Sequence, residues 1–187
     1  MAGSIDRRKK YTQMVVKDSF MQLLKEKPMS SITVKEICER ADVNRSTFYA
    51  HYYNQYDLLS RIEDETIEDM KGYLNQFDYG NQVDGLRLIE NLLEYFAAKR
   101  DICQTLLNEK AESTFQGKAT VVAHQYFMKN WTAIGHLDKD LSEYVSTFII
   151  NGSIHVVKSW LSNNMDKTPK EMAEMLIQLI DKGLFGH

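Results

Sequence analysis

The sequence is poor in the features that mark membrane and secreted proteins. Its 187 residues include only two cysteines and two prolines. No run approaches the roughly 18 uninterrupted apolar residues that a membrane helix needs. The opening residues, MAGSIDRRKKY, have no apolar segment behind their charges, which a secretory leader would have. We therefore expect a cytoplasmic protein without a membrane span.

The two cysteines do not suggest a disulfide framework or a metal site. Cys38 and Cys103 lie far apart in the sequence, and each falls inside an apolar helical pattern. Cysteine in such a setting usually behaves as a small buried hydrophobe. We expect two buried free thiols.

Motifs of the common enzyme classes are also missing. The sequence has no glycine-rich phosphate loop, no nucleophile elbow and no Cys and His arrangement typical of catalysis. None of its five histidines has metal-binding spacing with a carboxylate on the same helix face. We expect no catalytic residue, metal or cofactor, and an all-helical enzyme is an alternative without support. One acidic run reads most simply as a solvated helix face, and comprises Glu63, Asp64, Glu65, Glu68 and Asp69.

Charge is divided unevenly along the chain. Residues 1–53 carry ten Lys and Arg against six Asp and Glu, a net charge of +4, whereas residues 54–187 carry 13 against 20, a net charge of −7. This division into a basic head, residues 1–53, and an acidic body, residues 54–187, suggests that only the head binds a polyanion. Small imbalances of this kind are also common in proteins without such a partner.

Helical periodicity and capping signals divide the N-terminal region into short helices. Apolar spacing predicts a first helix over about 6–27, which ends before Pro28. Thr33 and Glu36 predict a capping box at the start of a second helix. Asn44 is expected to cap a third helix that ends near residue 51, and Asn54 a fourth that runs to about residue 77. The pattern is that of a helix-turn-helix.

In a helix-turn-helix, the third helix enters the major groove of DNA. At its start, Arg45 can donate two hydrogen bonds to a guanine, and a small Ala50 can contact a thymine methyl. Phe48 and Tyr52 are expected in the core. Hydroxyl, imidazole and amide groups around the third helix suit bases or phosphates. The candidate DNA-binding residues are Thr33, Lys35, Asn44, Arg45, Ser46, Thr47, Tyr49, Ala50, His51, Tyr53 and Gln55.

The stretch TVKEICERADVNRSTFYAHYYNQYDLL, residues 33–59, resembles the DNA-binding region of the TetR (tetracycline-repressor-like) family. Matching positions include Ala41, Val43 and Thr47. The resemblance implies an all-α homodimer, in which three N-terminal helices bind DNA, a fourth connects, and a helical body binds a ligand and dimerises. The family commonly has a phosphate-binding Lys where this chain has Gln55. The further matches are Thr33, Ile37, Tyr49, His51, Leu58 and Leu59.

The resemblance places an inducer cavity among the helices of the body, where aromatic residues would suit a small apolar or aromatic ligand. Apolar side chains at helical spacing are more often ordinary core, so this alternative stays open. The candidate pocket residues are Leu92, Phe96, Cys103, Leu107, Tyr126, Phe127, Trp131 and Phe148.

Two helices near the C-terminus, about 139–164 and 168–183, suit a dimer interface. The second has a capping box at Thr168 and Glu171, with Pro169 at its first position. Such a pair can form half of a four-helix interface, or a hairpin packed within one chain. The candidate interface residues are Ile149, Gly152, Val156, Trp160, Met175, Leu176 and Leu179.

We therefore expect a DNA-binding domain over 6–53 and a ligand-binding and dimerisation domain over 54–187. We expect the protein to be a homodimeric transcriptional regulator that binds a palindromic operator. It would act as a repressor, and a small molecule would release it from the operator. One alternative is an activator or co-regulator of the same fold. Another is a helical interaction module without DNA binding.

Overall fold

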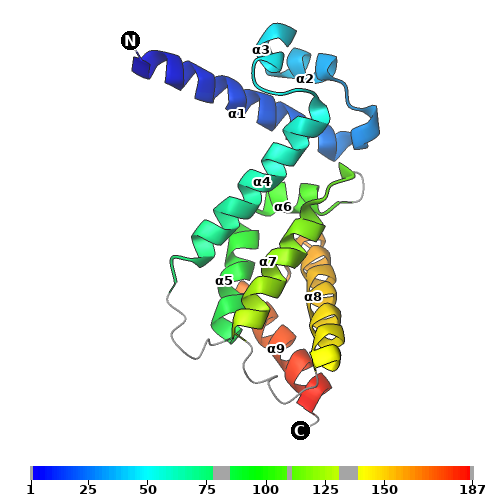
Figure 1. The fold of residues 1–187 in the computed structure, drawn as a ribbon. Coiled ribbons are helices and arrows are strands. Elements are labelled where there is room, and N and C mark those ends of the chain that lie inside the picture. The colour runs from blue at the N-terminus through cyan, green and yellow to red at the C-terminus, as the bar shows by residue number, and fades with distance from the viewer. Residues whose placement is uncertain (1, 78–84, 109–110, 131–138, 186–187) are drawn as a thin grey trace. The chain divides into compact units, whose positions relative to one another are not determined.

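The computed structural model describes residues 2–77, 85–108, 111–130 and 139–185, and within them every regular element is a helix (Figure 1). The all-α prediction is confirmed. No helix of this described part is long and apolar enough to cross a membrane. The helices are α1 (Ala2–Glu26), the 3-10 turn η1 (Met29–Ser31), α2 (Val34–Ala41), α3 (Arg45–Tyr49), α4 (Gln55–Leu74), α5 (Gly85–Ala98), α6 (Arg100–Leu106), α7 (Phe115–Asn130), α8 (Lys139–Ser162) and α9 (Pro169–Phe185).

The chain forms two compact units. The first contains residues 1–66 and 105–114, and the second contains residues 67–104 and 115–187. Helix α4 therefore belongs to both, as does α6. The first unit is larger than the expected domain over 6–53, because it includes the start of α4 and a segment from the middle of the chain.

The first unit is built on the C-terminal half of α1, which packs against α2, while α2 packs against α3. Val16, Phe20 and Leu23 supply the buried face of α1. Their spacing of three and four residues places them on one side of the helix. Ile37 of α2 and Phe48 of α3 are also fully buried, so each short helix is anchored by a core side chain.

Capping hydrogen bonds set the ends of the short helices. The capping box of α2 is confirmed: Glu36 N–H donates to the Thr33 hydroxyl, and Thr33 N–H donates to the Glu36 carboxylate at 3.0 Å. Asn54 caps α4 as predicted, because its Oδ1 accepts from the backbone N–H groups of Tyr56 and Asp57, both at 2.9 Å. Asn44 occupies the N-cap position of α3, but its side chain makes no capping hydrogen bond. The amide of Asn44 is left exposed to solvent.

The turn between α2 and α3 contains a strained residue. Asp42 has φ 52° and ψ 48°, in the left-handed region, and its N–H donates to the carbonyl of Cys38. Glycine adopts this conformation without steric cost, and Asp tolerates it better than most residues. The geometry explains why Asp42 can end α2 and turn the chain toward α3.

In the second unit, α9 packs along α5, and α8 contacts both α5 and α7. Trp160 of α8 is buried, and its indole N–H donates to the carbonyl of Lys167 at 2.9 Å. The predicted capping box at the start of α9 is present, since Thr168 N–H donates to Glu171 and Glu171 N–H donates to the Thr168 hydroxyl. These bonds fix the turn between α8 and α9. Both thiols, Cys38 and Cys103, are free and buried as predicted.

The prediction of a fully solvated acidic face on α4 is wrong at Glu63. The Glu63 side chain is only 2% exposed. Its carboxylate accepts from the Ser113 hydroxyl at 2.8 Å and from the backbone N–H and hydroxyl of Thr114. The donors come from residues fifty positions further along the chain, so helical periodicity around residue 63 cannot reveal them.

Candidate nucleic-acid interface

Helix α3 is anchored through one side and presents the other to solvent. The Phe48 side chain is completely buried, and its ring lies 5.4 Å from that of Tyr52. Tyr49 meets Phe48 edge to face at 5.6 Å, yet remains 57% exposed. A five-residue helix is not stable alone. Aromatic packing therefore holds α3 in place while its polar side faces outward.

The outward side carries most of the residues expected at DNA. The exposed set is Lys35, Asn44, Arg45, Ser46, Tyr49, Ala50 and Tyr53, with Thr47, His51 and Gln55 half-buried at its border. Arg45 is the first residue of α3. Its guanidinium can supply the paired donors that recognise the O6 and N7 atoms of a guanine. The structure thus brings the α3 candidates together on one accessible surface.

Thr33 is less available than the sequence suggests. Its N–H and its hydroxyl both bond to the Glu36 carboxylate, at 3.0 and 2.9 Å. Glu36 also pairs with Lys27. Hydrogen bonds from Lys27, and then from Thr33, lower the pKa of Glu36 to about 2. The predicted phosphate contact of Thr33 would therefore have to break a capping box that already uses both donors.

The start of α4 adds a second part of the surface. Tyr53 is 85% exposed, and its N–H donates to the Asp57 carboxylate at 2.8 Å, which fixes the entry into the helix. That bond, followed by one from Arg61, lowers the pKa of Asp57. Tyr56 was not expected here, but it is half exposed beside Gln55. Tyr56 is the second residue of α4, close in sequence to α3. This position is the signal that could have identified it as a candidate DNA contact.

Tyr52 closes the core behind this surface. Its ring lies 5.6 Å from the guanidinium carbon of Arg61, which is within cation–π range. The phenol hydroxyl is buried, and it has no hydrogen-bond partner among the described residues. Burial raises the pKa of Tyr52 to about 12. The prediction that Tyr52 is a core residue is confirmed.

The candidate pocket residues are not all brought together. Phe148 is 78% exposed, so it cannot line an internal pocket of its own chain. Leu107 belongs to the first unit, whereas the other described candidates belong to the second. Trp131 and the side chain of Phe127 lie outside the described residues. Leu92, Phe96, Cys103 and Tyr126 remain, all buried or half-buried in the second unit.

Two of these remaining residues have defined environments. The Tyr126 hydroxyl donates to Oδ1 of Asn75 at 2.8 Å. Cys103 is fully buried, and this burial raises the pKa of its thiol to about 12. A protonated thiol in an apolar setting is a poor nucleophile and a poor metal ligand.

The candidate dimer residues divide into two groups. Ile149, Trp160 and Leu176 are buried within the second unit of a single chain, so they are corrected to core residues. Gly152 and Leu179 are exposed, and Val156 and Met175 are half-buried. A Cβ placed on Gly152 would meet no atom within 4 Å. The expected close backbone approach at Gly152 therefore does not occur within this chain.

The sequence matches two family descriptions. Residues 18–62 match the family described as "Bacterial regulatory proteins, tetR family". Residues 86–182 match a family described as "Transcriptional regulator C-terminal region", which covers just over half of the chain. The first match contains α2 and α3, and the second spans α5 to α9.

Several curated proteins are similar to this chain. An uncharacterized HTH-type transcriptional regulator of Haemophilus influenzae is 22% identical, over 96% of this chain and 90% of that protein. The uncharacterized HTH-type regulator YxbF of Bacillus subtilis is 22% identical over 91% of this chain, but the match spans only 45% of YxbF. The dhaKLM operon transcriptional activator DhaS of Lactococcus lactis is 33% identical over 87 residues, 44% of each chain.

Solved structures share the fold at low sequence identity. A TetR transcriptional regulator from Streptococcus agalactiae superposes with a TM-score of 0.70 at 21% identity, over 96% of this chain and 99% of that one. NalD of Pseudomonas aeruginosa, described as the secondary repressor of the MexAB-OprM multidrug efflux pump, gives 0.62 at 20% identity, over 94% and 97%. FadR of Bacillus subtilis, solved with stearoyl-CoA, gives 0.59 at 16% identity, over 91% and 98%.

The family matches cover the helix-turn-helix and the helical body, and the structure places an exposed recognition helix where the first of them lies. The chain belongs to the TetR family of DNA-binding transcriptional regulators.

Proposed function

We propose that this protein is a repressor that binds a palindromic operator as a homodimer and leaves it when a small molecule binds the second unit. The observation that carries the DNA-binding part is the exposed polar side of α3, with Arg45 and Tyr49 accessible while Phe48 anchors the helix. Rigid anchoring matters, because base recognition depends on side chains held at fixed positions. Regulators of this family are generally not enzymes, and we propose the same for this chain.

A homodimer is supported by an exposed stripe on α8. Tyr144, Phe148 and Gly152 are spaced four residues apart, which places them on one side of the helix. The two aromatic side chains are exposed, as is Leu179 of α9. Exposed aromatic residues next to an exposed glycine suit close helix packing between two copies. A two-fold dimer would present two α3 helices to two half-sites about one helical turn apart, or a small multiple of that distance.

Release by a ligand is supported by relatives rather than by a cavity. FadR was solved with stearoyl-CoA, and NalD is described as a repressor. In this chain, Leu92, Phe96 and Tyr126 offer an apolar and aromatic environment in the second unit. A ligand can change operator affinity only if it binds the two conformations of the dimer with different affinity. DhaS is an activator, so activation is the second candidate.

The test begins with selection of bound duplexes from fragmented genomic DNA. We expect the wild-type protein to enrich a palindromic sequence and to bind it in a salt-dependent manner in mobility-shift assays. Arg45→Ala should weaken binding to that sequence by roughly tenfold to a hundredfold, in line with the 1–3 kcal/mol of a good base contact. The matched control is Lys170→Ala, an exposed cation on α9, which should bind as the wild type does.

Folding and regulation need separate measurements. Phe48→Ala should lose both stability and binding, whereas Arg45→Ala should retain its unfolding midpoint and its dimer in size-exclusion chromatography. A reporter gene behind the enriched sequence distinguishes repression from activation by the direction of the change. Absence of any sequence-selective binding by the wild type would contradict both regulator proposals.

A further inference from the structure

Several cations in the first unit form ion pairs with carboxylates of that unit. Arg40 holds Glu26 through two hydrogen bonds of 2.6 and 2.9 Å. Carboxylates also pair with the other cation of α2, with Lys17 of α1 and with cations on both sides of these helices. Further ion pairs in this unit are Lys17 with Glu65, Lys27 with Glu36, Lys35 with Glu39, and Arg61 with Asp57.

Four other cations have no such partner among the described residues. One is Arg45, at the start of α3, and the others are Arg7, Arg8 and Lys9 of α1, all of them exposed. Residues 7–17 include five Lys and Arg but no Asp or Glu. Unpaired cations that gather without local carboxylates leave a positive field that favours an external anion.

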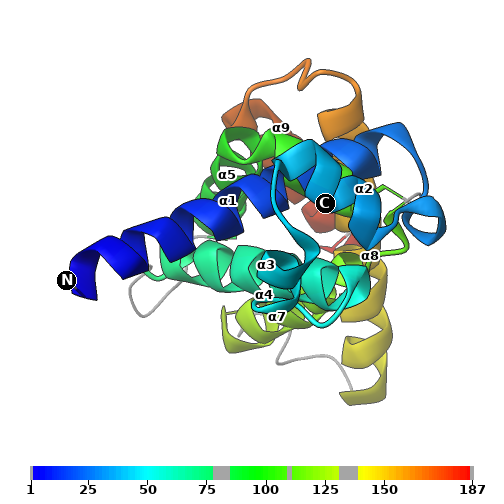
Figure 2. The ribbon, with the colours of Figure 1, turned by 90° about the horizontal axis from the view of Figure 1, so that it is seen from above.

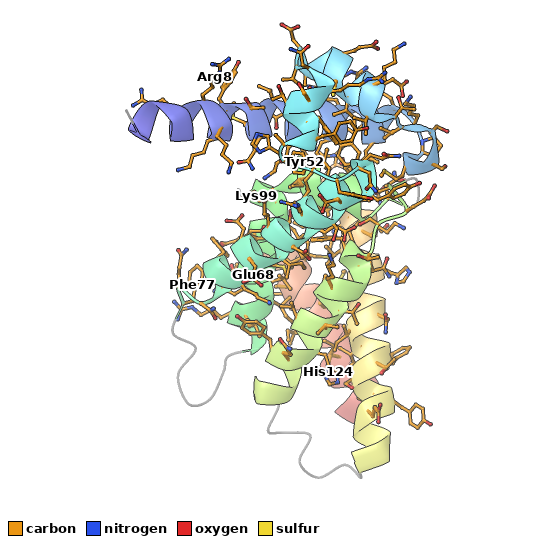
Figure 3. The ribbon with its side chains drawn as sticks, turned by 45° about the horizontal axis from the view of Figure 1, so that its top comes forward. Arg8, Tyr52, Glu68, Phe77, Lys99 and His124 are labelled. Atoms are coloured by element: carbon orange, nitrogen blue, oxygen red, sulfur yellow. The ribbon has the colours of Figure 1, made fainter. Side chains whose placement is uncertain are left out.

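These three α1 cations lie on a part of the helix that the core does not need. Between residues 7 and 15 no side chain is buried, and the buried face of α1 begins at Val16. The outer half of α1 extends away from α2 and α3 (Figures 1 and 2). At 1.5 Å per residue, Arg8 lies about 12 Å beyond Val16. Figure 3 shows Arg8 pointing outward from this half of the helix.

We propose that Arg7, Arg8 and Lys9 form a second DNA contact, which grips phosphates beside the base pairs that α3 reads. The inference rests on the proposed DNA-binding function. Consecutive residues on a helix are 100° apart, so one or two of the three cations face the duplex on whichever side it lies. Phosphate contacts add affinity without adding sequence preference. They also offset the neutral Gln55 at the start of α4.

DNA suits this cluster better than a membrane surface does. A helix that lies in a membrane interface needs a broad apolar face opposite its cations. On the outer half of α1, the large exposed apolar side chains are only Tyr11 and Met14 among the described residues. The cluster also belongs to the same compact unit as α3. A vesicle arm in the test separates the two partners.

The experiment compares a triple variant, Arg7→Gln, Arg8→Gln and Lys9→Gln, with a charge-matched control, Arg87→Gln, Lys167→Gln and Lys170→Gln. Glutamine keeps nearly the same helix propensity as Arg and Lys. The control removes the same charge from exposed positions of the second unit. The probes are the duplex that the wild type enriches from genomic DNA, with long flanks and with flanks trimmed to the palindrome.

We expect the plot of log affinity against log salt to become shallower by about one to two units in the triple variant, at roughly 0.9 for each lost phosphate contact. Trimming the flanks should lower the DNA affinity of the wild type and of the control, but not that of the triple variant. The preferred sequence should stay the same in all three proteins. Circular dichroism and size-exclusion chromatography confirm that the triple variant is folded and dimeric.

A triple variant that matches the control in salt slope and flank dependence would overturn the inference, while the proposed function would stand. A wild type that binds no duplex selectively would instead remove the proposed function. Co-sedimentation with vesicles containing phosphatidylserine tests the other partner. Vesicle binding that the triple variant loses, without any change in its DNA salt slope, would assign the cluster to a membrane.

Discussion

The Glu63 carboxylate accepts hydrogen bonds from both the backbone N–H and the hydroxyl of Thr114, at 2.9 and 2.6 Å. It also accepts from Ser113. A carboxylate in α4 thereby holds the residue that directly precedes α7, across fifty positions of sequence. The bond ties the segment 105–114 to the N-terminal part of the chain within the first unit.

Removal of this carboxylate should destabilise the protein strongly. We expect Glu63→Ala to lower the free energy of unfolding by about 2–4 kcal/mol, because it removes the three hydrogen bonds that this buried carboxylate accepts from Ser113 and Thr114. The measurement is urea denaturation followed by circular dichroism. Glu68→Ala is the matched control, since its exposed pair with Lys71 should be worth less than about 1 kcal/mol. Equal losses in the two variants would show that Glu63 is not a buried anchor.

Asp42 offers a test of backbone strain in the helix-turn-helix. Asp42→Val should lower the free energy of unfolding by about 1–2 kcal/mol, because a β-branched side chain is poorly accommodated at φ 52°. Asp42→Gly should change the free energy of unfolding by less than about 1 kcal/mol or increase it. Glycine relieves the backbone strain of the folded state, but it also gives the unfolded chain more conformational freedom. Thermal and urea unfolding of both variants provide the comparison. A Val variant as stable as the Gly variant would contradict left-handed geometry at this turn.

The buried hydroxyl of Tyr52 predicts a stabilising substitution. Tyr52→Phe removes a polar group without a partner and keeps the ring that packs on Phe48 and Arg61. We expect the free energy of unfolding to rise by up to about 1 kcal/mol, with DNA affinity unchanged. Urea denaturation tests this directly. A clear loss of stability in Tyr52→Phe would mean that the hydroxyl has a hydrogen-bond partner in solution. Phe48→Ala is the positive control, because loss of its buried ring should lower the free energy of unfolding whatever the hydroxyl does.

Gln55 should respond to a gain of charge. If this position faces a phosphate, Gln55→Lys adds about 0.9 to the magnitude of the salt slope of DNA binding. The affinity should rise most at low salt, where one extra cation is least screened. Mobility shifts over a range of salt concentrations supply the slope. Gln178→Lys, at an exposed position on α9, carries the same charge change and should leave the slope unaltered.

Glu36 predicts a loss of stability in acid. Its folded pKa of about 2 is below the ordinary 4.5, so its contribution is complete above about 4.5 and disappears as the pH falls through about 2. The stability difference between the wild type and Glu36→Gln should therefore shrink between pH 5 and pH 2. Denaturation midpoints across this range test the prediction. Glu39→Gln, outside the capping box, is the control. If the wild type stayed more stable than Glu36→Gln by the same amount down to pH 2, the prediction would be wrong.

Local signals in the sequence were enough to predict the short N-terminal helices and most of the caps. Thr33 with Glu36, Asn54 with Asp57, and Thr168 with Glu171 each act within four residues, so the sequence alone places them. Phe48 and Tyr52 were recognised as core by the same local pattern. Asn44 shows the limit of this approach, because its N-cap position is correct but its side chain makes no capping bond.

Interactions between distant residues could not be read in this way. Phe148 and Ile149 are neighbours in the sequence, and both are large and apolar. Only packing between helices decides that Ile149 is buried and Phe148 exposed. Trp160 is buried in the same way, and its indole N–H is satisfied by the carbonyl of Lys167. The assignment of Phe148 to the pocket, and of Ile149, Trp160 and Leu176 to the interface, was wrong. Amphipathic helices in the core of one chain and at a dimer interface share the same periodicity, so the sequence pattern cannot separate the two.

The sequence by itself determined the helical class, the caps of α2, α4 and α9, the turn between α2 and α3 and the residues on the outward side of α3, because these depend on neighbours within a few positions. The tertiary structure decided which charges remain available. It buried Glu63 against Thr114, joined Arg40 to Glu26, and left Arg7, Arg8 and Lys9 without a carboxylate partner among the described residues. A charge is neutralised by groups within a few ångströms in space, and the fold alone brings those groups together.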